Sequence, residues 1–293
     1  MNVQAILKVL WKSIRDSLSR KTWNWIGGGS VTSLLSVFLI GKNFLDTTVL
    51  KSIIYSAVFL VILFLIRFFL FFGINSFKYL HSVYRDSKYG DAIIFLKEGY
   101  AKVHAYRKLE EKTDEAFKNV LTSLCDSVQK AFKGKNSCDC SVSIKVPIRG
   151  VLTGQASVMN LCRDREHSIR DSANYKAIDH TIIGNTAFIK VLNRVLRNNP
   201  EGFFYLNNNI QNTQDYDNTS KDLYDNGILP YNSEIVVPII PIERDSSNTY
   251  EVLGFLCVDC TNKDKFEPKY DVPLIEGVVD GIYDIMKNRI NSE

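Results

Sequence analysis

The longest apolar segment of the chain is residues 49–74, VLKSIIYSAVFLVILFLIRFFLFFGI. Its only charged residues are Lys51, near its start, and Arg67, in its second half. As a helix, this segment is long enough to cross ~30 Å of hydrocarbon. The pattern therefore predicts a transmembrane helix. Arg67 would either extend its side chain to the nearby interface, the alternative we favour, or line a pore.

A weaker apolar segment, residues 23–45, precedes this helix and is diluted by glycine, serine and threonine. We predict a second transmembrane helix here, because small residues let helices pack closely in lipid. The alternative is an interfacial or re-entrant segment. Together the two helices would form a transmembrane hairpin over residues 23–74.

The first 22 residues form a separate element in which apolar side chains recur at helical spacing. They are Val3, Ile6, Leu7, Leu10, Ile14 and Leu18. Basic residues lie mostly on the other faces, so we expect a basic amphipathic helix on an anionic cytoplasmic leaflet. A simple anchor is favoured over a gating element.

Basic residues gather outside the two apolar segments, and the connection between the segments holds few of them. Those outside are Lys8, Lys12, Arg15, Arg20, Lys21, Lys78, Arg85 and Lys88. This bias predicts a multi-pass protein of the cell inner membrane with both termini in the cytoplasm. The net charge of +4 is explained by these residues and gives no reason to expect nucleic-acid binding.

Beyond the apolar segments, residues 75–111 are polar and contain Gly90 and Gly99, which predicts a linker of two or three short helices. From Phe117 to Phe132, apolar residues at helical spacing predict a helix that covers a sheet. Alternating patterns then predict five strands, at 140–148, 157–164, 203–206, 233–243 and 250–261. Helices are expected at 185–197 and 273–290, and the Asn/Asp-rich residues 207–225 are expected to form a long loop.

The strings SEIVVPIIPIE and VLGFLCVDC, followed by NKDKF and an amphipathic helix, resemble the second half of a GAF domain, a small-molecule-binding module of signalling proteins. The resemblance covers residues 112–291. It implies an antiparallel sheet of five or six strands, with the terminal helices on one face. A ligand pocket would lie on the other face, under helix 185–197 and the loop after it. The expected fold class is therefore α+β, with two transmembrane helices followed by a GAF-like domain.

Two variants of this family can be compared with the chain. Members that bind cyclic nucleotides carry an asparagine–lysine pair, a phenylalanine and two acidic residues. Here Asn262, Lys263, Phe266 and Asp271 match, but Val272 stands in the place of the second acid. We favour an ordinary surface turn.

The other variant, the GAF-type reductase of free methionine sulfoxide, needs a thiolate in its pocket. The expected pocket segments, residues 183–188 and 223–232, contain no cysteine. We also find no nucleophilic triad and no phosphate-loop, zinc-protease or kinase signature. The sequence thus predicts no catalytic residues and no enzyme.

All six cysteines follow the apolar segments, in a compartment that would keep them reduced. Cys138 and Cys140 begin one predicted strand, and Cys257 and Cys260 end another. In a GAF sheet these strands would be neighbours, so four sulfurs could bind zinc or an iron–sulfur cluster. However, a spacing of three splits a pair across both faces of a strand. Ordinary thiols are favoured, with no metal and no cofactor.

Five residues are candidates for ligand binding. Asn185 and Thr186 stand at a helix N-terminus, whose backbone N–H groups suit a phosphate. Asp215, Tyr216 and Glu234 would face a base or a ribose. The cluster from Arg163 to His167 is interpreted as a solvated turn, with the alternative that Arg163 or Arg165 contacts an anionic ligand.

These features together predict a membrane-anchored cytosolic sensor of a nucleotide-type ligand, in the narrowest form a cyclic nucleotide. Signalling would run through the transmembrane helices or through homo-oligomerisation, in an architecture that resembles effectors of bacterial antiviral defence. The first alternative is a ligand-free platform that docks a protein partner, and the second is a redox or metal sensor that uses the cysteines. A pocket filled by Phe203, Phe204 and Leu206 would favour docking, and an open pocket of ~300 Å³ or more would favour a ligand.

Overall fold

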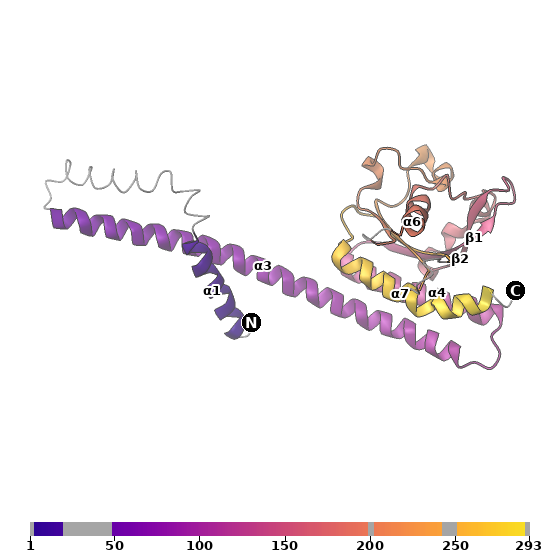
Figure 1. Cartoon of the computed structure of the whole chain (residues 1–293), viewed down its shortest axis with the longest axis horizontal. Helices are drawn as coiled ribbons and strands as arrows, with labels where there is room; N and C mark the ends of the chain where they lie inside the picture. Colours follow the sequence, from indigo (N-terminus) through magenta and orange to yellow (C-terminus); the bar gives the residue numbers. More distant parts are fainter. Residues whose placement is uncertain (1–2, 20–48, 199–201, 242–250, 291–293) are drawn as a thin grey trace. The chain divides into compact units, whose positions relative to one another are not determined.

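The computed structural model describes residues 3–19, 49–198, 202–241 and 251–290 (Figure 1). The chain divides into two compact units, Met1–Ser87 and Lys88–Glu293. The predicted helix at 23–45 lies outside the described residues. The domain boundaries drawn from the sequence stay predictions.

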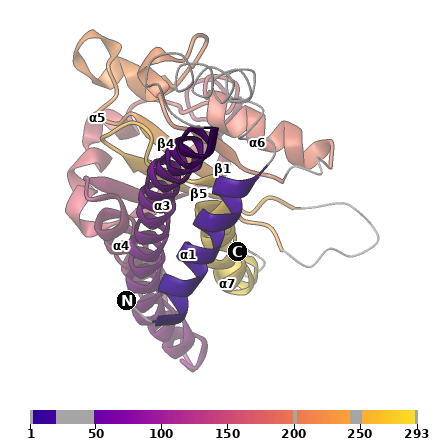
Figure 2. The ribbon, with the colours of Figure 1, turned by 90° about the vertical axis from the view of Figure 1, so that its left-hand side faces the viewer.

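The first unit contains helix α1, Val3–Leu18, and the first part of helix α3, Val49–Arg107. The two helices pack against each other (Figure 2). Asn75 Nδ2 of α3 donates hydrogen bonds to Ser13 Oγ, at 3.2 Å, and to Asp16 Oδ2, at 3.3 Å. The helix predicted at the N-terminus is therefore confirmed as a helix, and its place on a membrane surface stays a prediction.

Among the described helices, α3 is long and apolar enough to cross a membrane, judged by length and composition. Within its apolar part Arg67 is buried, and its guanidinium carbon lies 5.6 Å from the centroid of the Phe71 ring. Multi-pass insertion and the cytoplasmic orientation of both termini stay predictions.

The prediction of two or three short helices after residue 75 is wrong, because α3 continues unbroken to Arg107. Gly90 and Gly99 lie inside it. At Gly99 the missing side chain serves packing, since a Cβ there would lie 2.8 Å from Leu124 Cδ1 of the next helix. Close packing on a neighbouring helix thus offsets the weak helix propensity of this glycine.

The second unit is built on a five-stranded sheet with the order β2-β1-β5-β4-β3, in which every neighbouring pair is antiparallel. The strands are β1 Cys140–Arg149, β2 Ala156–Arg163, β3 Tyr205–Asn207, β4 Ser233–Pro238 and β5 Phe255–Cys260. The α+β fold and all five predicted strands are confirmed. β4 is shorter than predicted and ends at Pro238.

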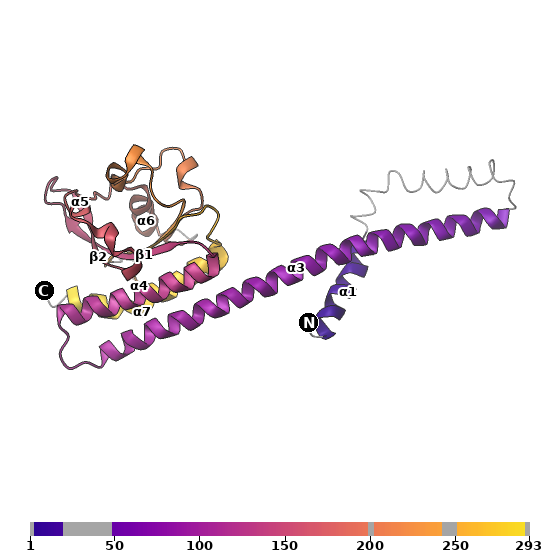
Figure 3. The same cartoon turned by 180° about the vertical axis from the view of Figure 1, so that it is seen from behind.

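Helices cover both faces of the sheet (Figures 1 and 3). On one face lie α4, Asp114–Asn136, and α7, Pro268–Ile290. On the other lies α6, Thr186–Leu196. Shorter helical segments are η1 Arg165–Asp171, α5 Ala173–Lys176, η2 Ile210–Asn212, η3 Thr219–Leu223 and η4 Asp225–Gly227.

Alternation along the strands gives each face its own core. On β5, Leu256, Val258 and Cys260 belong to the core under α4 and α7. Phe255 belongs to the core under α6, and Cys257 packs against it. The two layers expected from the GAF resemblance are therefore present.

Helix α7 begins five residues before the predicted start and contains Pro273 in its second turn. Asp271 explains the early start, because its carboxylate oxygen Oδ2 accepts the backbone N–H of Glu267, at 2.7 Å, just ahead of the helix. A carboxylate in the first turn also interacts favourably with the helix dipole.

Candidate functional site

A cavity of about 50 Å³ lies on the α6 side of the sheet. Its lining is unusually polar and charged. Side chains from three strands face it, namely Lys145 of β1, Glu234 of β4, and Cys257 and Asp259 of β5. Further lining residues come from the same strands, from α6 and its N-cap, from the loop between β3 and β4, and from the segment between Arg163 and Tyr175. We call this space the polar cavity.

Two arginines of the polar cavity are paired with carboxylates. Arg163 Nε lies 3.0 Å from Asp171 Oδ1, and its Nη1 donates to Ser141 Oγ at 2.9 Å. Arg170 Nη1 lies 2.8 Å from Asp259 Oδ1. Burial lowers the pKa of Arg163, but the two aspartates outweigh it and raise the pKa overall, so the guanidinium stays charged.

Lys145 is different, because no carboxylate of the described residues forms an ion pair with it. Its Nζ donates to the Tyr175 hydroxyl at 3.0 Å. The same nitrogen lies 5.5 Å from the ring centroids of Tyr175 and Phe188, which are cation–π distances. The polar cavity therefore contains an ammonium group that forms no ion pair with a carboxylate of the described residues, although its charge acts on the nearby Glu234.

Glu234 is buried, with 6% of its surface exposed. Its Oε1 accepts a hydrogen bond of 2.7 Å from the Tyr216 hydroxyl. Asn218 Nδ2 in turn donates to the hydroxyls of Tyr216 and Tyr231. Burial raises the pKa of Glu234 to about 7, although the Tyr216 hydrogen bond opposes this. Near neutral pH the carboxyl group is therefore protonated in part of the molecules, which limits the negative charge in the cavity.

Cys257 lines the polar cavity, although the two expected pocket segments, 183–188 and 223–232, contain no cysteine. The expectation considered only the segments that cover the pocket, whereas Cys257 lies on the sheet beneath them. Burial raises the pKa of this thiol to about 12. At neutral pH it is a protonated thiol rather than the thiolate that acts as a nucleophile.

Of the predicted ligand residues, Asn185 and Glu234 line the polar cavity. Tyr216 does not line the cavity itself, but its hydroxyl donates a hydrogen bond to Glu234, which does. The N–H groups expected to hold a phosphate are already used: Asn185 N donates to Ile182 O at 3.1 Å, and Thr186 N donates to Asp217 O at 3.0 Å.

Thr186 and Asp215 do not line the cavity. Thr186 Oγ1 accepts the backbone N–H of Asp217 at 2.8 Å, which ties the start of α6 to the loop. Asp215 is exposed and adopts a left-handed backbone conformation with a φ of 57°. Both residues therefore belong to the contact between α6 and the loop that follows β3.

The residues of the partial cyclic-nucleotide motif also lie away from the polar cavity. Phe266 is buried in the core on the other face, with its ring centroid 5.7 Å from that of Phe132. Asp271 forms a buried ion pair with Lys135, at 2.7 Å. In the cluster that begins at Arg163, Arg163 reaches the cavity, whereas Arg165 is exposed and pairs with Asp126.

Sequence reasoning missed Lys145, Arg170 and Asp259. Lys145 and Asp259 carried a signal, since both are charged residues at positions of β1 and β5 that face the same side as the α6 core. Arg170 lies in η1, a short helix without a clear hydrophobic pattern, so the sequence carried no signal for it.

Cys140 and Cys260 are joined by a disulfide, so the expectation that all six cysteines are reduced is corrected. β1 and β5 are indeed neighbours, and the two cysteines stand opposite each other in the register. Cys138 lies beside them, but Cys257 faces the polar cavity, so four sulfurs do not meet.

No protein-family model matches the chain. Curated proteins give no match either. Several solved structures are similar to it at low identity, among them two GAF domains and a reductase. A GAF domain has 12% identity and a TM-score of 0.40, and the alignment covers 66% of this chain and 88% of that one. The type II free methionine-R-sulfoxide reductase from Thermoplasma acidophilum has 16% identity and a TM-score of 0.37, with 59% and 96% covered. The GAF domain of an Acinetobacter phosphoenolpyruvate-protein phosphotransferase has 11% identity and a TM-score of 0.36, with 69% and 95% covered.

The similar structures thus include GAF domains, as the sequence resemblance led us to expect. They also include a reductase, which corrects the prediction that the chain is not an enzyme. The likeness does not make this chain an enzyme.

Proposed function

We propose that the chain is a membrane-anchored sensor that binds the anionic group of a small molecule in the polar cavity. The observation that carries this proposal is the ammonium group of Lys145, which faces the cavity without a carboxylate partner among the described residues. A phosphate or carboxylate accepting from Lys145 would gain a charge-assisted hydrogen bond in a site shielded from water. Partial protonation of Glu234 reduces the repulsion that such an anion would meet.

The nucleotide-type ligand is a narrower form of this proposal, and a role in bacterial antiviral defence is narrower still. Pockets for drug-sized ligands measure about 300–1,000 Å³, whereas the polar cavity measures about 50 Å³. A nucleotide would fit only after the loop that closes the cavity moves. This loop contributes Asn218, Ser220, Tyr224 and Tyr231 to the lining. Cationic side chains bind phosphate groups, and tyrosine rings can stack on a nucleobase. The lining of the polar cavity therefore supports the narrower form.

The test is ligand-induced stabilisation of the full chain in lipid nanodiscs. Inorganic phosphate, acetate and a panel of cyclic mono- and dinucleotides would be added before thermal unfolding. A ligand at ~100 times its dissociation constant stabilises the native state by ~2.7 kcal/mol. We expect this stabilisation for at least one anion, and we expect it to be lost in Lys145→Met.

Two further variants make the test specific. Lys263→Met removes an exposed lysine of the turn after β5 and should leave the stabilisation unchanged. Lys145→Arg keeps the charge and should retain part of it. Equal stabilisation of the wild type and Lys145→Met would show that the anion binds elsewhere, and no stabilisation by any compound would contradict the sensor.

The docking alternative has one observation in its favour. β2 is an edge strand, and a groove of about 870 Å³ runs along it, lined in part by exposed Val151, Leu152 and Met159. Phe203, Phe204 and Leu206 do not line the polar cavity, so the filled pocket that would favour docking is not seen among the described residues. If no anion binds, the groove is the surface on which to look for a protein partner or a second copy of the chain.

A further inference from the structure

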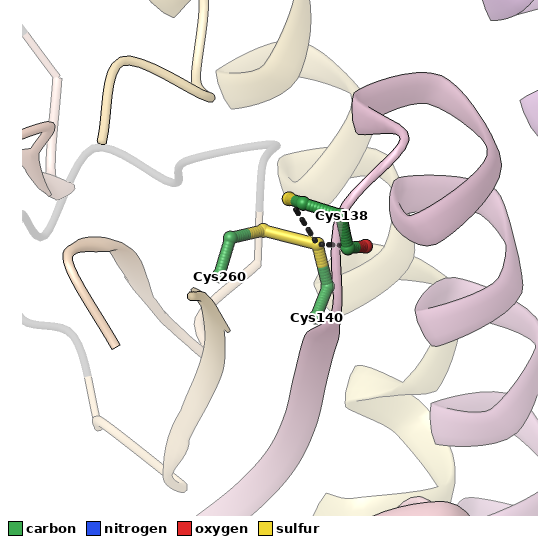
Figure 4. Close-up of side chains that lie close together, drawn as sticks. All are labelled: Cys138, Cys140 and Cys260. Atoms are coloured by element: carbon green, nitrogen blue, oxygen red, sulfur yellow. Dashed lines mark hydrogen bonds between the residues drawn. A yellow bond between two sulfur atoms is a disulfide. The ribbon is translucent and has the colours of Figure 1, made fainter. Parts of the chain in front are cut away.

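Three cysteine sulfurs meet on the face of the sheet that α4 and α7 cover, away from the polar cavity (Figure 4). Cys140 begins β1 and Cys260 ends β5, and their sulfurs form the disulfide. Cys138 Sγ lies 3.8 Å from Cys140 Sγ, and all three sulfurs lie within 4.8 Å of one another. Cys138 is partly exposed, so solvent species can reach this three-cysteine cluster.

N–H donors and cationic side chains lie around the three-cysteine cluster. Asn136 Nδ2 donates toward Cys260 Sγ at 3.4 Å and toward Cys140 Sγ at 3.7 Å. The backbone N–H of Asn262 and the charged groups of Lys265 and Lys135 lie near Cys138. N–H donors and cations around sulfur stabilise its negative charge.

The spacing also matches a shared metal ion. Two thiolates on a tetrahedral Zn²⁺, each about 2.3 Å from the metal, are about 3.8 Å apart. Cys138 and Cys140 already have this separation. Once the disulfide is opened, Cys260 needs only a small side-chain movement to take the same distance from both.

We propose that Cys138, Cys140 and Cys260 form a zinc site in the reduced protein and that the Cys140–Cys260 disulfide is its metal-free, oxidised state. A cellular dithiol supplies two electrons and two protons to the disulfide and itself becomes a disulfide. Zn²⁺ then displaces the three thiol protons and binds three sulfurs, with the fourth position taken by water. The inference does not depend on anion binding in the polar cavity.

The position of the cluster gives the site a route to helix α3. Lys88, in α3, donates from Nζ to the Lys135 carbonyl at 2.9 Å and to Ser137 Oγ at 3.0 Å. Lys135 and Ser137 flank Asn136 and directly precede Cys138. Metal binding or disulfide formation at the cluster therefore acts on the turn that Lys88 contacts.

The experiment uses the full chain in nanodiscs, reduced, freed of reductant under anaerobic conditions and titrated with Co²⁺ as a spectroscopic substitute for Zn²⁺. We expect a near-ultraviolet thiolate-to-cobalt charge-transfer band that saturates at one equivalent and disappears when Zn²⁺ is added. Cys138→Ser and Cys260→Ser should weaken Co²⁺ binding at least tenfold. The matched control Cys257→Ser, from the opposite face of β5, should bind like the wild type.

A thiol count on the unfolded protein confirms reduction, since the chain has six cysteines. Fully reduced protein that gives no band would overturn the proposal, as would an unchanged band in both Cys138→Ser and Cys260→Ser. Protein left in the disulfide state serves as a second readout. It should give no band until a dithiol is added, and a band before reduction would assign the metal to other ligands.

Discussion

Glu234 carries its carboxyl group into the polar cavity, where burial raises its pKa to about 7, from 4.5 in an exposed state. Between these two pH values the folded chain binds a proton that the unfolded chain has lost. The free energy of unfolding therefore falls as pH rises through this window, by ~3 kcal/mol in all. Below pH 4.5 both states are protonated, and the contribution of Glu234 is complete.

Glu234→Gln tests this sign, because an amide has the shape of the carboxyl group but does not titrate. The fall in stability between pH 4.5 and 8 should be smaller in the variant than in the wild type. Urea unfolding of the full chain, followed by circular dichroism at several pH values, measures the difference. Parallel curves for the two proteins would mean that Glu234 is already ionised in the folded state.

The second prediction at the residue scale concerns the buried ion pair of Lys135 and Asp271, whose side chains are 6% and 0% exposed. Asp271 also accepts a hydrogen bond of 2.9 Å from the Tyr89 hydroxyl. Asp271→Asn leaves a buried ammonium group without its counter-charge and should lower the free energy of unfolding by ~3 kcal/mol.

The control is the exposed pair of Arg107 and Asp284, whose side chains are 36% and 51% exposed. Asp284→Asn should cost no more than ~1 kcal/mol, since exposed pairs contribute little. Both variants can be compared with the wild type by thermal unfolding. An equal effect of the two changes would show that burial does not distinguish these pairs.

At the scale of elements, the two glycines of α3 make a matched pair. A Cβ at Gly99 would lie 2.8 Å from Leu124 Cδ1 and 2.9 Å from Ser127 Cβ of α4, whereas a Cβ at Gly90 meets nothing within 4 Å. Gly99→Ala should therefore destabilise the protein by ~1–3 kcal/mol through overpacking. Gly90→Ala should stabilise it by up to ~1 kcal/mol, because alanine is the better helix former.

Thermal unfolding of the two variants beside the wild type measures both effects. The two variants should change the free energy of unfolding in opposite directions, whereas helix propensity alone predicts the same gain in stability at both positions. Stabilisation by Gly99→Ala would mean that α3 and α4 can separate without loss.

The same two glycines explain why strands were easier to predict than the helix. Alternation in CSVSIKVPI and SEIVVP is a local signal that these strands keep in the sheet, and both segments form strands as predicted. The linker prediction relied on glycine as a local breaker and failed, because the packing that tolerates Gly99 comes from α4, more than twenty residues further along the chain. Local patterns do not contain that contact.

At the scale of the whole molecule, the polar cavity was only partly predictable, because its charges come from elements far apart in the sequence. Lys145 comes from β1, Arg170 from η1 and Glu234 from β4. The GAF resemblance indicated which face of the sheet would hold a pocket and led to Asn185 and Glu234. The resemblance did not give the register between β1 and β5. Without that register, Lys145 and Asp259 could not be assigned to the same cavity.

The proposed sensor also makes a prediction about α3, which runs unbroken from the apolar segment into the second unit. Ser87→Pro removes a backbone N–H and bends the helix between the two units, on an exposed position. Anion-induced stabilisation should persist in this variant. A ligand-induced change in vesicle leakage or in cross-linked oligomers should be lost.

Leakage and cross-linking would be measured with the full chain in vesicles, with and without the anion that stabilises the wild type. Ser82→Ala, five residues earlier in α3, is a control that leaves the backbone hydrogen bonds in place. A response of Ser87→Pro equal to that of the wild type would show that the signal does not need a continuous helix.

The alternation on β5 has a consequence for how the chain can change through evolution. Asp259 pairs with Arg170 of the polar cavity, and the next residue, Cys260, belongs to the three-cysteine cluster on the other face. Deleting one residue from β5 would move each later side chain to the opposite face of the sheet. Asp259 would then face α4 and α7, and Cys260 would face Arg170. Single substitutions can alter either site separately, but insertions and deletions cannot. In distant relatives, the length of this strand should therefore be preserved even where its sequence has diverged.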